Sequence, residues 1–247
     1  MSKLQGKRIL VTGGARGMGR SHVEYLSELG ARVVIADVLD ADGAELASEL
    51  RGQNRDVVFV HLDVTSETNW ARVVAHAQSL WGGLDGLVNN AGVTGTWGGP
   101  EVEDLSAWNA TIAVNQTGSY LGIRHVAPLM RSAGGGAIVN VSSILGFVGD
   151  GDYFAYSASK GALRTMTRAA ALKYANDAVR VNAICPGMVR TPMNDEEADA
   201  DGYVSHTPLK RMAEPIEISR AVAFLLSDDA SYITGSDLVI DGGYLAR

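Results

Sequence analysis

Tyr156 and Lys160 are the residues whose types and spacing most clearly suggest chemistry. They stand four apart in the stretch YSASK, so both side chains share one face if this segment is helical. A tyrosine hydroxyl ordinarily titrates near pH ~10, too high for proton transfer at neutral pH. An ammonium group about 4 Å from the phenolate favours the charged form by about 4 kcal/mol in partly screened surroundings. The pair therefore predicts a tyrosine with a lowered pKa that acts as a general acid and base.

A glycine-rich stretch, TGGARGMG (12–19), ends the first apolar run of the chain. Glycines let the backbone turn tightly and approach a pyrophosphate, and the N-terminus of a following helix offers free N–H groups and a positive dipole end. The glycine spacing departs from the GxGxxG fingerprint, so the interpretation depends on the position between a strand and a helix. The stretch predicts a phosphate-binding turn.

Asp37 ends the second apolar run. A carboxylate there can accept hydrogen bonds from both hydroxyls of an adenosine ribose, and it would repel a 2′-phosphate. This favours NAD over NADP, although Arg16 in the glycine-rich stretch could attract such a phosphate. An ordinary turn residue is the alternative interpretation of Asp37.

The elements that must position these residues follow from the apolar pattern. Seven short runs are continuously apolar rather than alternating, which predicts strands buried on both faces of a parallel sheet. Most are separated by stretches with helical spacing, so we predict one α/β domain over residues 1–247, a doubly wound, Rossmann-type, seven-stranded parallel sheet with helices on both faces. The strands are expected at 8–14, 31–37, 57–63, 84–90, 137–143, 179–187 and 238–243. The helices are expected at 18–29, 41–50, 66–81, 106–131, 153–174 and 216–227.

Polar residues and glycines follow the ends of these runs, where open parallel sheets bind their ligands. Asp63 could bind an adenine amino group or cap the helix that begins near Thr65. Asn89 and Asn90 could contact a ribose or tie neighbouring strand ends together. The residues at this predicted binding edge are Gly13, Asp37, Asp63, Asn89, Asn90, Ser143, Pro186 and Gly187.

Composition narrows the classes of function. The formal net charge of −7 and the absence of a basic run argue against nucleic acid or an anionic membrane as partner. Cys185 is the only cysteine, which fits a reducing compartment, and no signal peptide or apolar membrane-length run is present, so we expect a cytoplasmic protein. The five histidines show no zinc-binding spacing, so no metal site is expected.

Taken together, the motifs resemble the short-chain dehydrogenase/reductase family over essentially the whole chain. Each motif is common alone, but their order and spacing are specific. Among members, the chain is most similar to bacterial NAD-dependent hydroxysteroid and secondary-alcohol dehydrogenases. The resemblance is carried by TGGARGMG, Asp37, LDV (62–64), NNAG (89–92), Asn115, NVSS (140–143), YSASK and PGMVRT (186–191).

The resemblance implies roles for individual residues. Tyr156 would transfer the proton of the substrate oxygen, and Lys160 would lower the pKa of the tyrosine and hold the nicotinamide ribose. Ser143, thirteen residues before Tyr156, would orient the substrate oxygen, with Ser142 as the alternative hydroxyl. Asn115 would support a water relay to the lysine, or would only mark a helix bend.

The same resemblance implies an NAD site and a pocket for a small-molecule substrate. A lid is expected at about 188–212, and GDGD (149–152) is interpreted as a solvated turn in preference to a contact with a polar substrate. The expected cofactor contacts are Gly13, Arg16, Gly17, Met18, Gly19, Asp37, Asp63, Val64, Asn89, Asn90, Ala91, Gly92, Tyr156, Lys160, Pro186, Gly187, Val189 and Thr191. The expected apolar pocket wall consists of Trp97, Leu145, Phe147, Met188 and Met193.

The leading hypothesis is NAD-dependent interconversion of a hydrophobic, cyclic or steroid-like secondary alcohol and its ketone. One alternative is an NADP-dependent 3-ketoacyl thioester reductase, which Asp37 and the net charge disfavour. Another is a nucleotide-binding regulator without turnover, which would leave Ser143, Tyr156 and Lys160 unexplained. Alanine-rich faces on the two long helices suggest a homo-oligomer, with a tetramer favoured.

Overall fold

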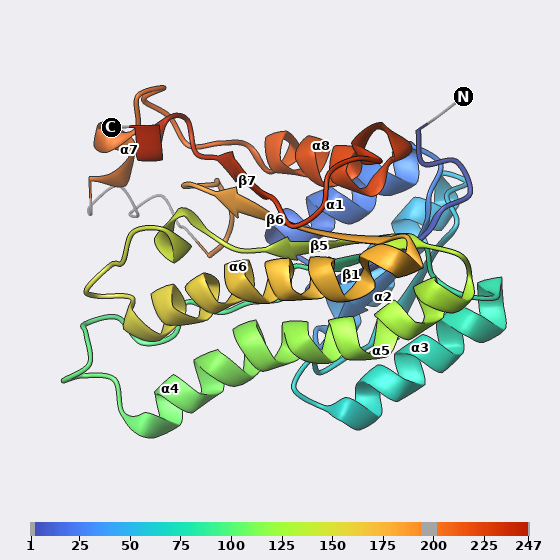
Figure 1. Ribbon diagram of the computed structural model, residues 1–247, viewed down its shortest axis with the longest axis horizontal. Coiled ribbons are helices and arrows are strands. Elements are labelled where there is room, and N and C mark those ends of the chain that lie inside the picture. Colours follow the sequence, from blue (N-terminus) through green and yellow to red (C-terminus); the bar gives the residue numbers. More distant parts are fainter. Residues whose placement is uncertain (1–2, 194–201, 247) are drawn as a thin grey trace.

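The computed structural model describes residues 3–193 and 202–246, and a parallel sheet forms its centre (Figure 1). Over these residues the sheet has seven strands in the order β3-β2-β1-β4-β5-β6-β7. Every neighbouring pair is parallel, which confirms the predicted doubly wound sheet. The strands are β1 (Arg8–Thr12), β2 (Arg32–Asp37), β3 (Val57–His61), β4 (Gly86–Asn89), β5 (Gly136–Val141), β6 (Val179–Pro186) and β7 (Asp237–Ile240).

Helices cover both faces of the sheet. One face packs against α1, α2 and α8, and the other against α3, α5 and α6; Figure 1 shows α1 and α8 on the side of the sheet opposite to α5 and α6. The helices are α1 (Gly17–Glu28), α2 (Asp40–Gly52), α3 (Glu67–Trp81), α4 (Leu105–Ile112), α5 (Gly118–Ser132), α6 (Phe154–Tyr174), α7 (Tyr203–His206) and α8 (Pro215–Leu226).

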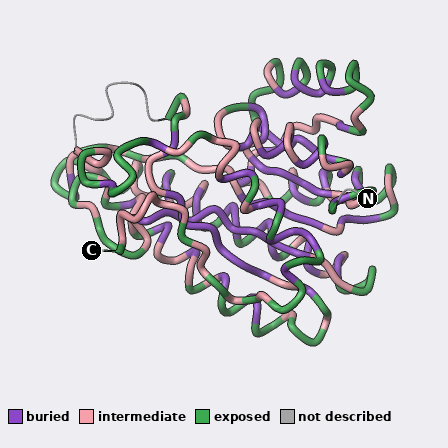
Figure 2. Tube along the Cα trace, turned by 90° about the horizontal axis from the view of Figure 1, so that it is seen from above, coloured by how far each residue is buried: buried purple, intermediate pink, exposed green. Residues whose placement is uncertain are grey.

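Strand β1 shows why a continuous apolar run predicts a central strand. Ile9 and Val11 belong to the core beneath α1 and α8, while Leu10 between them belongs to the opposite core with α3 and α5. All three are fully or almost fully buried, because successive side chains of a strand point to opposite faces. In Figure 2 the buried residues accordingly run through the middle of the molecule, with exposed residues on the outer surfaces of the helices.

Local signals explain where several helices begin. The side chain of Ser66 accepts a hydrogen bond from the amide of Asn69 at 3.3 Å and caps α3. At α8, Glu214 and Glu217 form a reciprocal capping box, and Pro215 occupies the first turn, where a missing N–H is harmless. These starts lie within one residue of the sequence prediction.

The predicted helix at 106–131 is interrupted. The structure has α4, then a π-helix at Ala113–Thr117, then α5. A π-helix inserts one extra residue into a turn and is frequent at functional sites. Asn115 lies in this π-helix, and its contacts are described below. The short helix α7 was not predicted, and residues 194–201 of the predicted lid at 188–212 lie outside the described residues.

Candidate active site

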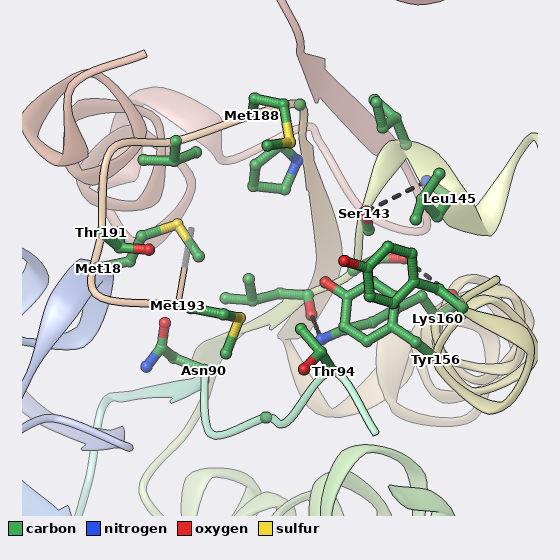
Figure 3. Close-up of a pocket in the computed structure, with 18 of the residues that line it drawn as sticks. Met18, Asn90, Thr94, Ser143, Leu145, Tyr156, Lys160, Met188, Thr191 and Met193 are labelled. Carbon is green, nitrogen blue, oxygen red and sulfur yellow. Dashed lines mark hydrogen bonds between the residues drawn. The ribbon is translucent and has the colours of Figure 1, made fainter. Parts of the chain in front are cut away.

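A cavity of about 170 Å³ opens at the carboxyl edge of the sheet. Its walls come from the segment after β5, from the start of α6, and from the segment after β6. Figure 3 shows Ser143, Leu145, Tyr156 and Lys160 gathered on one side, with Met18, Asn90, Thr191 and Met193 on the other. The sequence prediction of a binding site at this edge therefore matches the position of the cavity.

Tyr156 and Lys160 occupy successive turns of α6 at the wall of this cavity. The Nζ atom of Lys160 is 5.3 Å from the centre of the Tyr156 ring. It donates a hydrogen bond of 2.8 Å to the carbonyl oxygen of Val141, the last residue of β5. Only 4% of Lys160 is exposed, so the ammonium group is held between the end of the strand and the tyrosine.

The pKa of Tyr156 differs from the sequence prediction. Loss of solvent raises the pKa of Tyr156 above its ordinary value, and the hydrogen bond with Ser143 lowers it by less. The expected lowering of this pKa is therefore wrong for the protein as described, because desolvation outweighs the hydrogen bond with Ser143, and the ammonium group of Lys160 is directed at the Val141 carbonyl. Burial also lowers the pKa of Lys160, to about 8.

The two serines after β5 have different partners. The Ser143 hydroxyl accepts a hydrogen bond of 3.1 Å from the amide of Leu145 and caps a 3₁₀ turn at Ile144–Gly146, and it also bonds to Tyr156. The Ser142 hydroxyl instead donates to the carbonyl oxygen of Lys160 at 2.8 Å. Of the two, Ser143 is the hydroxyl placed beside the tyrosine oxygen.

Asn115 lies in the π-helix and is completely buried. Its side chain pairs with the backbone of Val93, accepting from the N–H at 2.8 Å and donating to the carbonyl at 2.9 Å. It also donates to the Ser159 hydroxyl, which donates in turn to the carbonyl of Tyr156. Asn115 therefore joins the loop after β4 to the turn of α6 that carries Tyr156.

A second cavity, of about 400 Å³, continues from the first toward β2. Both cavities are lined by Met18, Asn90, Gly92, Thr191 and Met193, so the two form one cleft. Of the expected cofactor contacts, the second cavity is lined by Gly13, Arg16, Gly17, Met18, Gly19, Asp37, Asp63, Val64, Asn90, Ala91, Gly92 and Thr191. The first cavity is lined by the remaining ones except Asn89, namely Tyr156, Lys160, Pro186, Gly187 and Val189.

Asp37 stands at the far end of this cleft. One carboxylate oxygen accepts from the amide of Ala15 at 3.0 Å and the other from the amide of Leu39 at 3.1 Å. The carboxylate therefore fixes the glycine-rich turn and also faces the cleft, so the two interpretations of Asp37 are compatible. Arg16, whose charge could attract a 2′-phosphate, forms an ion pair with Asp42 at 2.8 Å.

The glycine-rich turn depends on close backbone contact. Gly13 and Gly17 adopt φ values of +61° and +55°, which favour glycine. A Cβ atom on Gly19 would lie 1.8 Å from the carbonyl oxygen of Gly13, so the first turn of α1 packs directly on the loop. Asn90 donates from its side chain to the carbonyls of Thr12 and Gly13 at 2.9 and 3.0 Å.

These features fit a dinucleotide. The cleft offers a carboxylate at the ribose end, a glycine-rich strand-to-helix turn, and a buried ammonium group at the other end. At Gly92 a Cβ would stand 3.3 Å from Oδ1 of Asn115 and 3.4 Å from Nζ of Lys160. The missing side chain there keeps the cleft open beside the lysine.

Asn89 is placed differently from the expectation of a cofactor contact, and Asp63 lines the cleft but also has partners within its own turn. The Asn89 side chain lies below the cleft and donates to Asn140 at 2.8 Å and to the carbonyl of Ser119 at 3.3 Å. It ties strand ends together, because the side chain at the end of a strand points into the adjoining layer. Asp63 lines the cleft, but its carboxylate also accepts from the amide and hydroxyl of Thr65 at 2.9 and 2.7 Å.

The apolar wall is only partly as expected. Leu145, Met188 and Met193 line the cavity. The structure does not bring Trp97 or Phe147 into that wall: Trp97 is 60% exposed, and the Phe147 ring is covered by the guanidinium group of Arg164. A sequence shows that an aromatic residue is near a motif but not which way its ring turns.

Five residues that line the first cavity were not predicted as site residues: Thr94, Val141, Ile144, Tyr153 and Tyr203. Tyr153 stands one helical turn before Tyr156, a spacing that could have revealed it. Tyr203 lies in the polar stretch of the predicted lid and carries no such signal. Its ring stacks on Tyr244 with centroids 5.8 Å apart, and its hydroxyl donates to Asp150 in the GDGD turn.

Within residues 3–193 and 202–246, no three side chains of His, Cys, Asp or Glu gather as metal ligands. Burial raises the pKa of the Cys185 thiol to about 12, so it is a neutral group beside the site. None of the helices that the structure describes is long and apolar enough to cross a membrane.

The comparisons with known proteins agree with this geometry. Residues 13–245 match a family model described as "Enoyl-(Acyl carrier protein) reductase". The chain is 45% identical over 244 residues to the 3-alpha-(or 20-beta)-hydroxysteroid dehydrogenase of Mycobacterium tuberculosis, covering 99% of this chain and 91% of that protein. It is 42% identical over 253 residues to the cyclopentanol dehydrogenase of Comamonas testosteroni, covering 100% of both. The crystal structure of gox2181 matches with a TM-score of 0.96 at 30% identity, covering 100% and 99%.

The fold and the site thus define an oxidoreductase built on a nucleotide-binding parallel sheet. The chain belongs to the short-chain dehydrogenase/reductase family, whose dehydrogenases use nicotinamide cofactors. The resemblance stated from the motifs is confirmed.

Proposed function

We propose that this protein is an NAD-dependent dehydrogenase that interconverts a hydrophobic cyclic or steroid-like secondary alcohol and its ketone. The observation that carries the proposal is the convergence of Ser143, Tyr156 and Lys160 on one cavity that is continuous with the cleft ending at Asp37. The names of the two curated relatives, one a steroid and one a cyclopentanol dehydrogenase, support a cyclic alcohol. So do the apolar side chains of Leu145, Met188 and Met193.

The proposed chemistry assigns one task to each side chain. The hydroxyl of Ser143 donates a hydrogen bond to the substrate oxygen and orients it, and Tyr156 takes up or returns the proton of that oxygen. Lys160 keeps a positive charge beside the ring, and Asn115 holds the surrounding backbone. The nicotinamide, when bound, supplies the hydride acceptor or donor.

The raised pKa of Tyr156 is consistent with this assignment. In the protein as described, the phenol is protonated at neutral pH and suited to donate a proton during ketone reduction. Alcohol oxidation needs the phenolate, so additional positive charge must enter the cavity before the proton can leave. An oxidised nicotinamide is cationic and would act in this direction together with Lys160.

Asp37 supports NAD rather than NADP. Its carboxylate faces the cleft where the ribose hydroxyls of the adenosine are expected. The charge of Arg16 is paired with Asp42, which leaves it less available to a 2′-phosphate. An acyl thioester reductase, which the name of the matching family suggests, would have to bind an acidic carrier with a chain of net charge −7.

The experiment is a spectrophotometric assay of NADH formation with cyclopentanol, cyclohexanol and hydroxysteroids, and of NADPH oxidation with 3-ketoacyl and enoyl thioesters. We expect turnover of the alcohols with NAD. Tyr156→Phe should lower kcat on the order of 10²–10⁴-fold while retaining NAD binding. Tyr153→Phe, which removes a neighbouring hydroxyl of the same cavity, is the matched control and should keep turnover within about tenfold.

Tighter binding of NADP than NAD, a preference for thioesters, or near-full activity of Tyr156→Phe would each contradict the proposal. We further propose a cytoplasmic homo-oligomer, as expected from the sequence. Light scattering of the purified protein tests the oligomer, since a mass equal to the monomer's 26.0 kDa would refute it.

A further inference from the structure

Arg164 continues the row of functional residues along α6. Tyr156, Lys160 and Arg164 stand four apart, so their side chains emerge on one face of the helix. The first two line the cavity. The third is 18% exposed in its side chain and points at the segment that carries Ser143.

The guanidinium group of Arg164 binds that segment directly. Its Nη1 donates a hydrogen bond of 2.6 Å to the carbonyl oxygen of Gly146. The same group lies over the Phe147 ring, 3.2 Å from the ring centre. Gly146 ends the 3₁₀ turn that the Ser143 hydroxyl begins, so Arg164 holds the end of the turn opposite to the serine.

The turn also rests on the helix backbone. A Cβ atom on Gly146 would lie 2.9 Å from both the carbonyl carbon and the carbonyl oxygen of Lys160. The segment 143–147 therefore packs directly against α6 at the lysine, with no side chain between them at Gly146. This contact and the hydrogen bond from Arg164 to Gly146 both join the segment that carries Ser143 to α6.

Asp237 fixes the arginine in this orientation. The Nε atom of Arg164 donates to the Asp237 carboxylate at 3.0 Å, and only 6% of that side chain is exposed. Arg168, one turn further along α6, binds the same carboxylate oxygen. A planar guanidinium group can serve the carboxylate on one edge and the Gly146 carbonyl on another, which a lysine ammonium cannot do with the same geometry.

We propose that Arg164 is a positioning residue for the reaction, which holds the Gly146 carbonyl and thereby keeps the Ser143 hydroxyl beside the Tyr156 oxygen. This inference rests on the proposed function, in which Ser143 orients the substrate oxygen. It assigns Arg164 no contact with substrate. Its effect on catalysis therefore passes through Ser143 and disappears when that hydroxyl is removed.

The test is a double-mutant cycle with Ser143→Ala and Arg164→Gln, measured as kcat and KM for the best alcohol and as the Kd for NAD. Displacing a catalytic group by about 1 Å costs on the order of 10²-fold in rate. We expect Arg164→Gln to lower kcat by about 10- to 100-fold with the Kd for NAD unchanged within about twofold. In the Ser143→Ala background, Arg164→Gln should lower kcat by less than about threefold further.

Two further variants separate positioning from general stability. Arg168→Gln removes the other partner of Asp237 and should keep kcat within about twofold. Arg164→Lys retains the charge and one hydrogen bond, and should recover part of the kcat lost in Arg164→Gln. Hydrogen exchange supplies a readout that needs no turnover: the amides of Gly146, Phe147 and Val148, which bond within the turn at 3.0, 2.8 and 3.1 Å, should exchange faster in Arg164→Gln but not in Arg168→Gln.

The possible failures are distinguishable. If Ser143→Ala keeps full turnover, the proposed function of Ser143 fails and the inference fails with it. If Ser143→Ala loses turnover but Arg164→Gln does not, the inference alone is overturned. The inference alone is also overturned if the rate losses of the two substitutions multiply in the double variant, or if Arg168→Gln lowers kcat as much as Arg164→Gln.

Discussion

Replacing Lys160 by methionine should abolish turnover and at the same time stabilise the protein without cofactor. Burial lowers the pKa of Lys160 to about 8, with no carboxylate among the causes of the shift. A cation in such surroundings is destabilising until an anion or a cofactor balances it. Methionine has a similar length and no charge, so Lys160→Met removes the free-energy cost of burying the ammonium group and keeps most of the packing.

The magnitude follows from the same shift. A fall of the lysine pKa from 10.5 to about 8 corresponds to about 3 kcal/mol. The substitution also removes the hydrogen bond to the Val141 carbonyl, which costs about 1 kcal/mol. At pH 7 the free energy of unfolding should therefore rise by about 2 kcal/mol, equivalent to roughly 5 °C in Tm for a chain of this size.

The sign of the pH dependence provides a second measurement. Between about pH 8 and 10.5 the unfolded wild type binds more protons at this lysine than the folded wild type, so the wild type gains stability as the pH rises. The advantage of Lys160→Met should shrink by about 2 kcal/mol between pH 7 and about pH 9.5.

Urea unfolding of the cofactor-free protein at both pH values measures this, with Lys173→Met on the exposed side of α6 as control. The control should change the free energy of unfolding by less than about 0.5 kcal/mol. If Lys160→Met is less stable than the wild type at pH 7 with an unchanged m-value, the ammonium group stabilises the folded state and the reasoning is refuted.

Two further predictions concern acid stability and cofactor choice. Burial lowers the pKa of His22 to about 3, so stability present above pH 6.5 is lost as the pH falls toward 3, by about 2 kcal/mol at pH 5. His22→Gln should remove most of that loss between pH 7 and 5 in urea unfolding, and an unchanged loss would exclude His22 as its source. Asp42→Asn frees Arg16 and should raise the affinity for NADP relative to NAD by a few-fold, because exposed ion pairs are weak. Equal affinity ratios in the variant and the wild type, measured by calorimetry, would show that Asp42 does not restrain the arginine.

Most of the fold could be predicted from the sequence, because its signals are local. Residues such as Ile9, Leu10 and Val11 form a continuous apolar run, and only burial on both faces of a sheet makes such a run favourable. The predicted helix starts at 66 and 216 lie within one residue of the observed starts of α3 and α8. The π-helix around Asn115 was not predicted, and the pairing of that amide with the backbone of Val93 is a contact between distant parts of the chain, which local signals do not reveal.

Residues of the candidate site could be predicted where their place at the cavity depends only on their position along the backbone. Ser143, Tyr156 and Lys160 lie in one cavity because strand ends and helix starts meet at one edge of the sheet. The directions of the side chains of Asn89 and Phe147 could not be predicted, since neighbours from other segments determine them. Close approach, burial and rotamer are properties of the packed structure.

The pKa of Tyr156 likewise could not be predicted from the sequence. From the sequence, the neighbouring ammonium group can be counted and its attraction estimated. The cost of removing water from the phenol cannot, because it depends on the walls that Ile144, Leu145 and Met188 contribute to the cavity. Here desolvation outweighs the hydrogen bond from Ser143, so the proximity of the charge alone led to the wrong sign.

A common principle connects the site to the fold. Where a parallel strand ends, its last carbonyl groups lose their partners in the sheet and need other donors. At β1 the carbonyl of Thr12 receives the side-chain amide of Asn90, and at β5 the carbonyl of Val141 receives the ammonium group of Lys160. The side chains that face the cleft thus also complete the hydrogen bonding of the sheet edge. Because one group does both, substitution of Asn90 by alanine should disturb the glycine-rich turn as well as the cleft, whereas a change at exposed Lys173 on α6 should disturb neither.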